Sequence, residues 1–264
     1  EIYVFLRGGE ITTAYGGSYQ SDIESSYIKV EDGATVGDLF GGNNESGTST
    51  LTHVNVTGGT ISNNVYGGNN AGGIARNTYV FITGGTFGSS KGIYGCGKGA
   101  ATRCVNTHVD IDADAPGSVY GGGEEASVHN TAQNAKTLVN IRSGSVGSVF
   151  GGSNTNGTVD NSYIYTTGDV VVNNVYGGNN VGGTAANPNV YIGGGTITNV
   201  YGGGKQVYTG DTYIELISGT TTNVYGGGED SDYKGAKYKL TFDYFKDYPL
   251  KNPKIKFVTD IYHC

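Results

Sequence analysis

A short element built from an aliphatic residue, an aromatic residue and two small residues recurs nine times along this chain of 264 residues. The last two positions are both glycine, except for one cysteine, and successive copies lie 24 to 30 residues apart. Residues 63–73 and 173–183, which contain two copies, agree at ten of eleven positions. A repeat of this length indicates a solenoid, in which each coil packs only against its neighbours. The nine aromatic residues are Tyr15, Phe40, Tyr66, Tyr94, Tyr120, Phe150, Tyr176, Tyr201 and Tyr225.

A second element follows each copy by about a dozen residues and alternates in polarity, as in THVNV at 52–56 and TYVFI at 78–82. Alternate residues of a strand share a face, so stacking these copies in register gives two aliphatic columns that must face inward. The first column is Val4, Ile28, Val54, Val80, Val109, Val139, Ile164, Val190 and Ile214. The second is Leu6, Val30, Val56, Ile82, Ile111, Ile141, Thr166, Ile192 and Leu216. A row of hydroxyls stands at the strand entrance: Ser26, Thr52, Thr78, Thr107, Thr137, Ser162 and Thr212.

These patterns predict an all-β fold, a right-handed parallel β-helix of about nine coils over residues 1–228. Each coil has roughly 26 residues and three short strands: the alternating element, a short segment such as Thr60–Ile61, and the strand that enters the Gly-Gly turn. Nine coils spaced by one strand separation would make a rod roughly 43 Å long. The glycines allow a sharp corner with positive φ. We expect the aromatic column to serve packing.

The motifs VYGGNN (65–70), VYGGGEE (119–125) and NVYGGGK (199–205) give this part of the chain a family resemblance. The chain resembles the V-Y-G-G-G-N repeat arrays of bacterial surface and secreted proteins that are described as adhesin-like. The resemblance implies an extracellular or cell-surface location and a structural or adhesive role. The same fold also hosts polysaccharide-degrading enzymes, but none of their catalytic motifs aligns with this sequence.

The two ends of the chain differ from its repeats. The sequence enters its first strand element at once, and an uncapped solenoid end is an open sheet edge. We therefore expect the edge strand, Ile2, Tyr3, Val4, Phe5 and Leu6, to meet preceding coils of a longer chain or another molecule. Residues 229–264 break the repeat and predict a C-terminal cap or the start of a following module, in which KYKLTF at 237–242 could form a tenth strand.

The outward positions of the alternating element are rich in aromatic residues, and we call them the outward aromatic strip. Flat rings can stack on sugar faces, can bury themselves against another subunit, or can simply stabilise neighbouring strands. The sequence leaves these three alternatives open. If the strip binds a ligand, such as a glycan or a host surface, the candidate contact residues are Tyr27, Tyr79, Phe81, His108, Tyr163, Tyr165, Tyr191 and Tyr213.

Cysteine and acidic residues offer few further sites. Cys96 takes a turn glycine position and Cys104 follows eight residues later, so in an exported protein we expect a disulfide between them. His53 and His108 should lie two coils apart, too far to share a metal ion. A structural calcium ion at Glu124–Glu125 or Glu229–Asp230 is an alternative, although the spacing differs from known calcium repeats. We expect no other cofactor.

Charge and hydropathy exclude two classes of partner. A net charge of −7 repels a phosphate backbone, so we expect no nucleic-acid ligand. No apolar run approaches the roughly 18 residues of a membrane helix. The sequence favours a non-enzymatic structural or adhesive solenoid; the alternatives are a subunit of a filament stacked end to end and a polysaccharide lyase or hydrolase. An enzyme would use Asp110 and Asp112, which point the same way from one strand.

Overall fold

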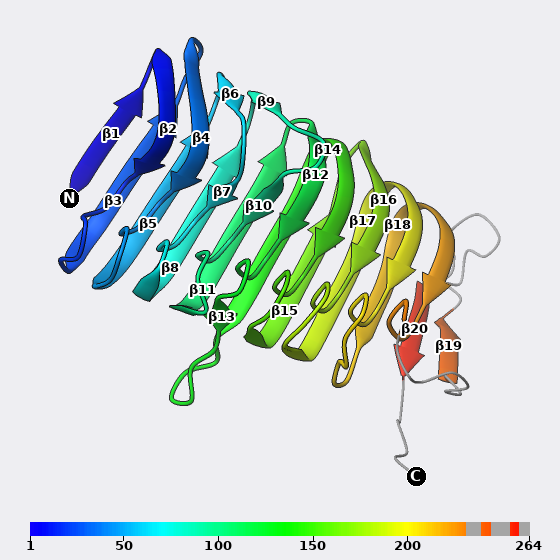
Figure 1. Cartoon of the computed structure of the whole chain (residues 1–264). Coiled ribbons are helices and arrows are strands. Elements are labelled where there is room, and N and C mark those ends of the chain that lie inside the picture. Colours follow the sequence, from blue (N-terminus) through cyan, green and yellow to red (C-terminus); the bar gives the residue numbers. More distant parts are fainter. Residues whose placement is uncertain (231–238, 244–253, 259–264) are drawn as a thin grey trace.

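The structure is a computed structural model that describes residues 1–230, 239–243 and 254–258. Its elements are all strands, and they stack into a β-solenoid of about nine turns of about 26 residues (Figure 1). The strands of residues 1–230 pair in parallel, each with the strand one turn later in the chain. The predicted β-solenoid is therefore confirmed.

The alternating elements form one continuous sheet along the rod. Their register is the one that the sequence columns require: Val4 lies beside Ile28, which lies beside Val54. The strands begin a few residues before the alternating element, because the segment after each turn is already extended and paired. The strands of this sheet are β1 (Ile2–Leu6), β3 (Ile23–Val30), β5 (Thr48–Val56), β8 (Gly72–Ile82), β11 (Ala101–Asp112), β14 (Lys136–Phe150), β15 (Thr158–Thr166), β17 (Thr184–Tyr201) and β18 (Tyr213–Tyr225).

The remaining segments return the chain to the next turn. Three separate strands per coil, as predicted, occur where β5 and β8 are each followed by two short strands. In the other coils these segments merge, and β14, β17 and β18 run through the corner without a break. The returning strands are β2 (Gly9–Tyr15), β4 (Ala34–Phe40), β6 (Thr60–Ile61), β7 (Val65–Tyr66), β9 (Thr86–Phe87), β10 (Gly92–Tyr94), β12 (Ala115–Tyr120) and β16 (Val170–Tyr176). A short strand, β13 (Ser127–Val128), adds to a third face.

The two aliphatic columns form the core, as predicted. Their members are fully or almost fully buried, apart from Val4, Leu6 and Leu216, which are half-buried. Where the aliphatic pattern changes to Thr166, its hydroxyl donates to the carbonyl oxygen of Gly194 at 2.9 Å. Within the described residues, every buried side-chain nitrogen or oxygen atom has a hydrogen-bond partner. The core can therefore continue from coil to coil without the cost of an unpaired buried polar group.

The nine aromatic side chains form a second buried column beside the core. Neighbouring rings lie 4.6 to 5.1 Å apart between centroids and within 13° of parallel, from Tyr15 to Tyr225. The predicted packing role is confirmed, because this column is buried over most of its length.

The strand-entrance hydroxyls explain how each Gly-Gly turn is held. The Oγ1 atom of Thr52 donates to the carbonyl oxygen of Gly67 at 2.5 Å, and that of Thr78 donates to Gly95 at 2.5 Å. A Cβ on Gly67 would stand 2.2 Å from the carbonyl oxygen of Gly95 in the next coil. Close stacking of the turns, rather than a positive φ, is thus what requires glycine here. The same hydroxyl contact recurs at Ser26, Thr107, Thr137, Ser162 and Thr212.

The parallel pattern ends with β18. There β20 (Lys254–Val258) pairs antiparallel with β18, and β19 (Lys239–Asp243) pairs antiparallel with β20. The expected tenth strand at 237–242 is therefore wrong as a continuation of the solenoid, since the described part of it joins this antiparallel pair. The rest of the predicted segment 229–264 lies largely outside the described residues.

Candidate functional site

The outward aromatic strip lies on the sheet built from β1 to β18, in the predicted register. Its first column runs through Tyr27, Tyr79, His108, Tyr163 and, after Asn189, Tyr213. The second column includes the remaining candidates Phe81, Tyr165 and Tyr191. Tyr165 is 36% exposed, whereas the other seven candidates are half-buried. The rings therefore shield one another while keeping one edge or face toward solvent.

The strip is divided into two stacked groups by a gap at β14. In the N-terminal group, His53 stacks on Tyr79 with ring centroids 4.9 Å apart, and Tyr79 contacts His108 at 5.7 Å. In the C-terminal group, Tyr165 stacks on Tyr191 with centroids 4.7 Å apart. Between the groups, β14 presents Leu138 and Asn140 in place of rings. Two ring-bearing surfaces thus face each other across one strand.

A hollow of about 420 Å³ fills this gap. Its floor is a single strand, because Lys136, Leu138 and Asn140 alternate outward along β14. Its C-terminal wall is made by Tyr163 and Tyr165, the neighbours of Leu138 and Asn140 on β15. The hollow exists because short side chains stand between longer ones.

A polar cluster around Asp110 lies on β11, on the other side of β14; Asp110 is 8% exposed and does not itself line the hollow. The Asp110 carboxylate lies 2.9 Å from His108 Nε2, and it accepts hydrogen bonds from Asn140 at 2.6 Å and Arg142 at 2.8 Å. Burial opposes its ionisation, but the contacts with His108 and Asn140 and the Arg142 charge outweigh burial, so the pKa of Asp110 is lowered. Asp112 accepts a hydrogen bond from Ser143 at 2.6 Å. Asp110 and Asp112, the pair that the enzymatic alternative would use, are thus both engaged by neighbouring side chains.

The arrangement can hold a flat ligand with polar edges. Asp110, Asn140 and Tyr165 are register partners on three successive strands, so β11 and β15, which flank the floor strand, are about 9.5 Å apart. A sugar ring in van der Waals contact with the Tyr165 ring needs about 4 Å of separation from it. Burial raises the pKa of Tyr165 and Tyr191, so both keep their hydroxyl protons as donors at neutral pH.

The edge strand and the cysteines are also in the expected positions. In the edge strand, Ile2 to Leu6 pair with residues 26–30, and Tyr3 and Phe5 are 60% and 48% exposed. Cys96 and Cys104 form the predicted disulfide. It joins the turn after β10 to β11 and buries both sulfur atoms beside Ala75 and Ala126.

The acidic residues at which the sequence allows calcium have other partners. Glu124 accepts a hydrogen bond from Tyr66, and Glu229 accepts one from Tyr176, each at 2.5 Å. Within the described ranges, no group of three or more acidic, histidine or cysteine residues is arranged to hold a metal ion. In the same residues, no helix has the length and apolarity needed to cross a membrane.

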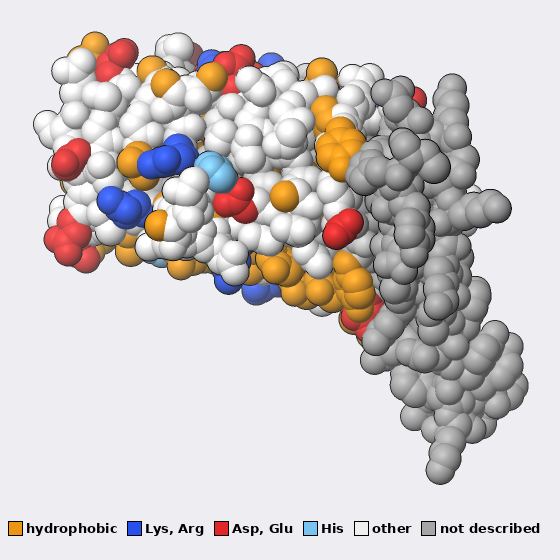
Figure 2. All heavy atoms as spheres, turned by 90° about the horizontal axis from the view of Figure 1, so that it is seen from below, with side chains coloured by type: hydrophobic (Ala, Val, Ile, Leu, Met, Phe, Trp, Pro, Cys, Tyr) orange, Lys and Arg blue, Asp and Glu red, His pale blue; other side chains and the backbone are white. Residues whose placement is uncertain are grey.

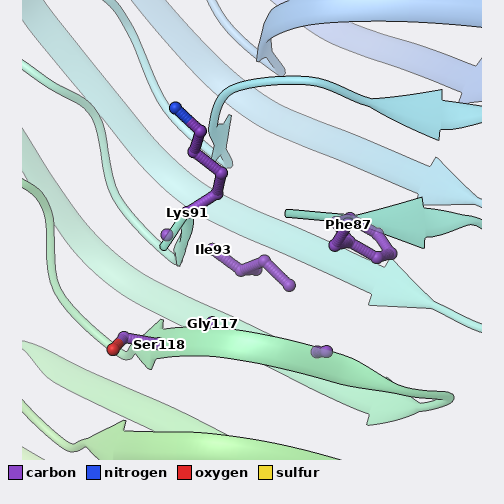
Figure 3. Close-up of a pocket in the computed structure, with 7 residues that line it drawn as sticks. Phe87, Lys91, Ile93, Gly117 and Ser118 are labelled. Atoms are coloured by element: carbon purple, nitrogen blue, oxygen red, sulfur yellow. The ribbon is translucent and has the colours of Figure 1, made fainter. Parts of the chain in front are cut away.

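Other irregularities of the surface carry no comparable chemistry. The gap between Phe87, Lys91 and Ile93 has no space for a water molecule (Figure 3). On the face shown in Figure 2, charged side chains are scattered and hydrophobic ones gather along one long edge.

Comparison with known proteins gives one partial match. The model of the ubiquitin-conjugating enzyme family matches residues 218–264, which include the end of β18 and mostly lie outside the described residues. No curated protein and no solved structure matches the chain. The matched residues do not include most of the solenoid or any residue of the hollow, so the match says nothing about the activity of either.

The sequence-based candidates include Tyr163 and Tyr165 but not the floor of the hollow. Lys136, Leu138 and Asn140 are absent from them because these outward positions of β14 carry no ring. The register of the columns contained the signal, since it puts Leu138 between His108 and Tyr163.

Proposed function

We propose that this chain is a non-enzymatic structural and adhesive β-solenoid of a bacterial surface or secreted protein, and that it binds glycans along the outward aromatic strip. The binding position is the hollow over β14. The observation that carries this proposal is the position of Tyr165, which stacks one ring face on Tyr191 and lines the hollow on its other side.

The composition of the hollow suits a carbohydrate. Sugars present an apolar ring face and a rim of hydroxyls, which match a tyrosine ring bordered by amide and ammonium groups. Lys136 supplies an ammonium donor at one end of the floor, and Leu138 supplies an apolar surface next to it. At the other end Asn140 offers its amide oxygen, because its amide nitrogen already donates to Asp110. The hydrogen bond from Asn140 to the Asp110 carboxylate, which also contacts His108 and Arg142, fixes part of the floor before any ligand arrives. A preorganised site lowers the entropic cost of binding.

The test is calorimetric binding of a panel of neutral and acidic oligosaccharides to the folded chain. We expect Tyr165→Ala to weaken binding about tenfold, as loss of one aromatic contact predicts. The matched control is Tyr19→Ala, which removes an exposed ring outside the strip. Binding that is absent across the panel, or that falls equally in both variants, contradicts the proposal.

The same Tyr165→Ala variant, studied by sedimentation velocity, separates glycan binding from self-association of the strip. If the strip instead buries itself against a second copy, sedimentation velocity will show oligomers that Tyr165→Ala dissociates. A monomer at all concentrations, together with sugar binding, favours the adhesive role.

A further inference from the structure

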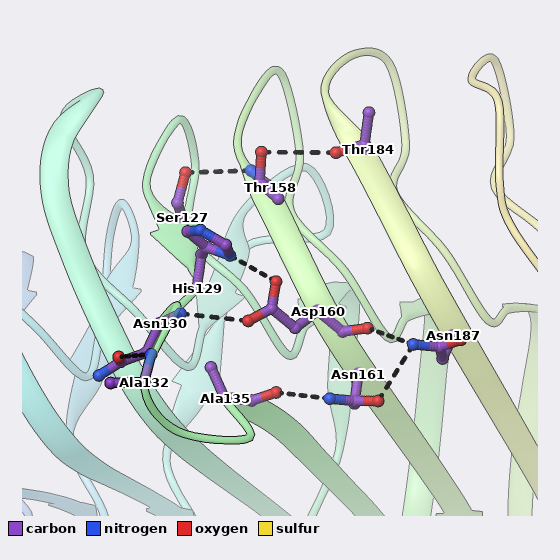
Figure 4. Close-up of polar contacts among 10 residues, drawn as sticks. All are labelled: Ser127, His129, Asn130, Ala132, Ala135, Thr158, Asp160, Asn161, Thr184 and Asn187. Carbon is purple, nitrogen blue, oxygen red and sulfur yellow. Dashed lines mark hydrogen bonds and ion pairs between the residues drawn. The ribbon is translucent and has the colours of Figure 1, made fainter.

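A second hollow, of about 400 Å³, lies on the third face of the solenoid, away from the aromatic strip. It is formed where the segments after the turns pair in register, so that Arg103 of β11 stands beside Ser127 of β13. Thr158 of β15 and Thr184 of β17 continue the same row (Figure 4). Arg103, Ser127, Thr158 and His129 all line the hollow. The side chains around it therefore come from three successive coils.

His129 is held in a fixed orientation beside this row. Its Nδ1 atom lies 2.5 Å from Asp160 Oδ1, and the backbone N–H of Asn130 donates to the other carboxylate oxygen of Asp160 at 3.1 Å (Figure 4). Asn161 Nδ2 donates to the carbonyl oxygen of Ala135 at 3.0 Å, which fastens the far end of the same loop. Since Nδ1 faces the Asp160 carboxylate, Nε2 is the ring nitrogen left for a ligand, and it donates a hydrogen bond only when the imidazole is protonated.

The hydroxyls beside His129 are used as acceptors, which leaves their hydrogens free. Ser127 Oγ accepts a hydrogen bond from the backbone N–H of Thr158 at 3.0 Å. Thr158 Oγ1 accepts one from Thr184 Oγ1 at 3.4 Å. A hydroxyl carries one donor hydrogen and two acceptor lone pairs. Both hydroxyls can therefore still donate to a group in the hollow.

The charged or ionisable side chains that line this hollow are basic. No carboxylate lines it, because Asp160 lies behind His129 and neutralises that ring when it is charged. Within the described residues Arg103 forms no ion pair. A planar guanidinium with adjacent hydroxyl donors matches the geometry of a carboxylate, sulfate or phosphate group.

We propose that the hollow bounded by Arg103, Ser127, His129 and Thr158 is an oxyanion-binding site for a sulfate, phosphate-monoester or carboxylate group. Arg103 forms the charged contact, and the two hydroxyls donate to the remaining oxygens; His129 Nε2 adds a donor when the imidazole is protonated. The whole chain has a net charge of −7, so recognition depends on these local donors and not on long-range attraction. This site is independent of the proposed glycan site, which lies on another face.

The experiment is an NMR titration of the folded chain with inorganic sulfate, inorganic phosphate and acetate, following the His129 ring. Sodium chloride at matched ionic strength is the reference. We expect a saturable shift with at least one oxyanion and none with chloride. Arg103→Gln should weaken the interaction at least tenfold, whereas Arg76→Gln, the same charge change at another exposed arginine, should leave it unchanged. Circular dichroism of both variants checks that the fold is retained.

Three outcomes overturn the proposal: no saturable shift with any of the anions, an equal response to chloride, or equal affinities in wild type and Arg103→Gln. A last comparison identifies the source of the anion. Tighter binding of a sugar sulfate or a uronic acid than of the free ions assigns the site to an acidic glycan. Equal affinity assigns it to the free anion.

Discussion

The hydroxyl of Tyr66 donates a hydrogen bond to the carboxylate of Glu124, two coils further along the rod. The same two-coil reach recurs when Asn154 donates to Tyr94 at 3.1 Å and when Tyr176 donates to Glu229 at 2.5 Å. The partner always occupies the position four residues after the aromatic residue of its own coil. Counting two coils on from Phe40 and Phe150 reaches Lys98 and Lys205 at this position. Tyrosine is therefore used where an asparagine or glutamate partner is available, and phenylalanine where the corresponding residue is lysine.

This relationship predicts a measurable coupling between Tyr66 and Glu124. Tyr66→Phe should lower the free energy of unfolding by about 2 kcal/mol, because it removes a hydrogen bond to a charged acceptor. Glu124→Gln should cost less, since the amide oxygen still accepts. Denaturant unfolding of both single variants and the double variant gives the coupling energy. Additive effects would show that the two side chains do not interact in solution.

The buried aromatic column predicts a sharp alkaline transition. Burial, as the main cause, raises the pKa of Tyr66, Tyr94 and Tyr176 above the ordinary value for tyrosine. A raised pKa in the folded state means that stability is intact below about pH 10 and falls as the pH rises through the folded-state pKa. Tyr213 belongs to the outward aromatic strip and not to the column; burial and the nearby Glu215 raise its pKa to about 12.

Tyrosinate absorbance measured together with circular dichroism tests this. The column tyrosines should titrate only as the strands unfold, so the two signals should change together. Smooth ionisation of all tyrosines near pH 10 without unfolding would mean that the column is open to water.

Periodicity was enough to predict the fold and the register of the outward aromatic strip, whereas the second hollow required knowledge of a loop. The inward columns could be predicted because alternation fixes the face of each residue, so Val54 and Val80 had to stack. The sequence could not predict that strands merge in β14 and β17, because merging depends on whether the corner residues keep their backbone hydrogen bonds to the next coil. The contact between His129 and Asp160 also could not be predicted, because these residues are 31 positions apart and the path of loop 129–135 decides whether they meet.

The lowered pKa of Asp110 predicts that its cluster stabilises the protein above acidic pH. For an acid with a lowered folded-state pKa, the stabilisation is present above the unfolded-state pKa near 4 and is lost as the pH falls through the folded-state value. Asp110→Asn should therefore be less stable than wild type by about 2 kcal/mol at pH 7. The difference should shrink between about pH 5 and pH 2 in denaturant unfolding. A difference that does not vary with pH would exclude an ionic role for Asp110.

The disulfide between Cys96 and Cys104 should stabilise the chain by restricting the unfolded state. The bridge closes a short loop, for which chain-entropy estimates give about 2.5 kcal/mol. The fitting variant is Cys96→Gly with Cys104→Ala, because glycine occupies the equivalent turn position in every other coil. Its midpoint of unfolding should fall to that of the reduced wild type. An unchanged midpoint after reduction would mean that the disulfide adds nothing to the free energy of unfolding.

Asp160 should keep the loop that follows β13 ordered. Its carboxylate contacts the His129 ring and the backbone N–H of Asn130 in the same loop. Asp160→Ala removes both contacts, so amide hydrogen exchange of residues 130–135 should accelerate by about tenfold or more. Asp169→Ala is the control, because it removes an exposed aspartate from another turn. Exchange in β14 and β15 should stay slow in both variants, since their backbone pairing does not involve the carboxylate. Faster exchange throughout these strands would mean that Asp160 supports the solenoid itself rather than the loop.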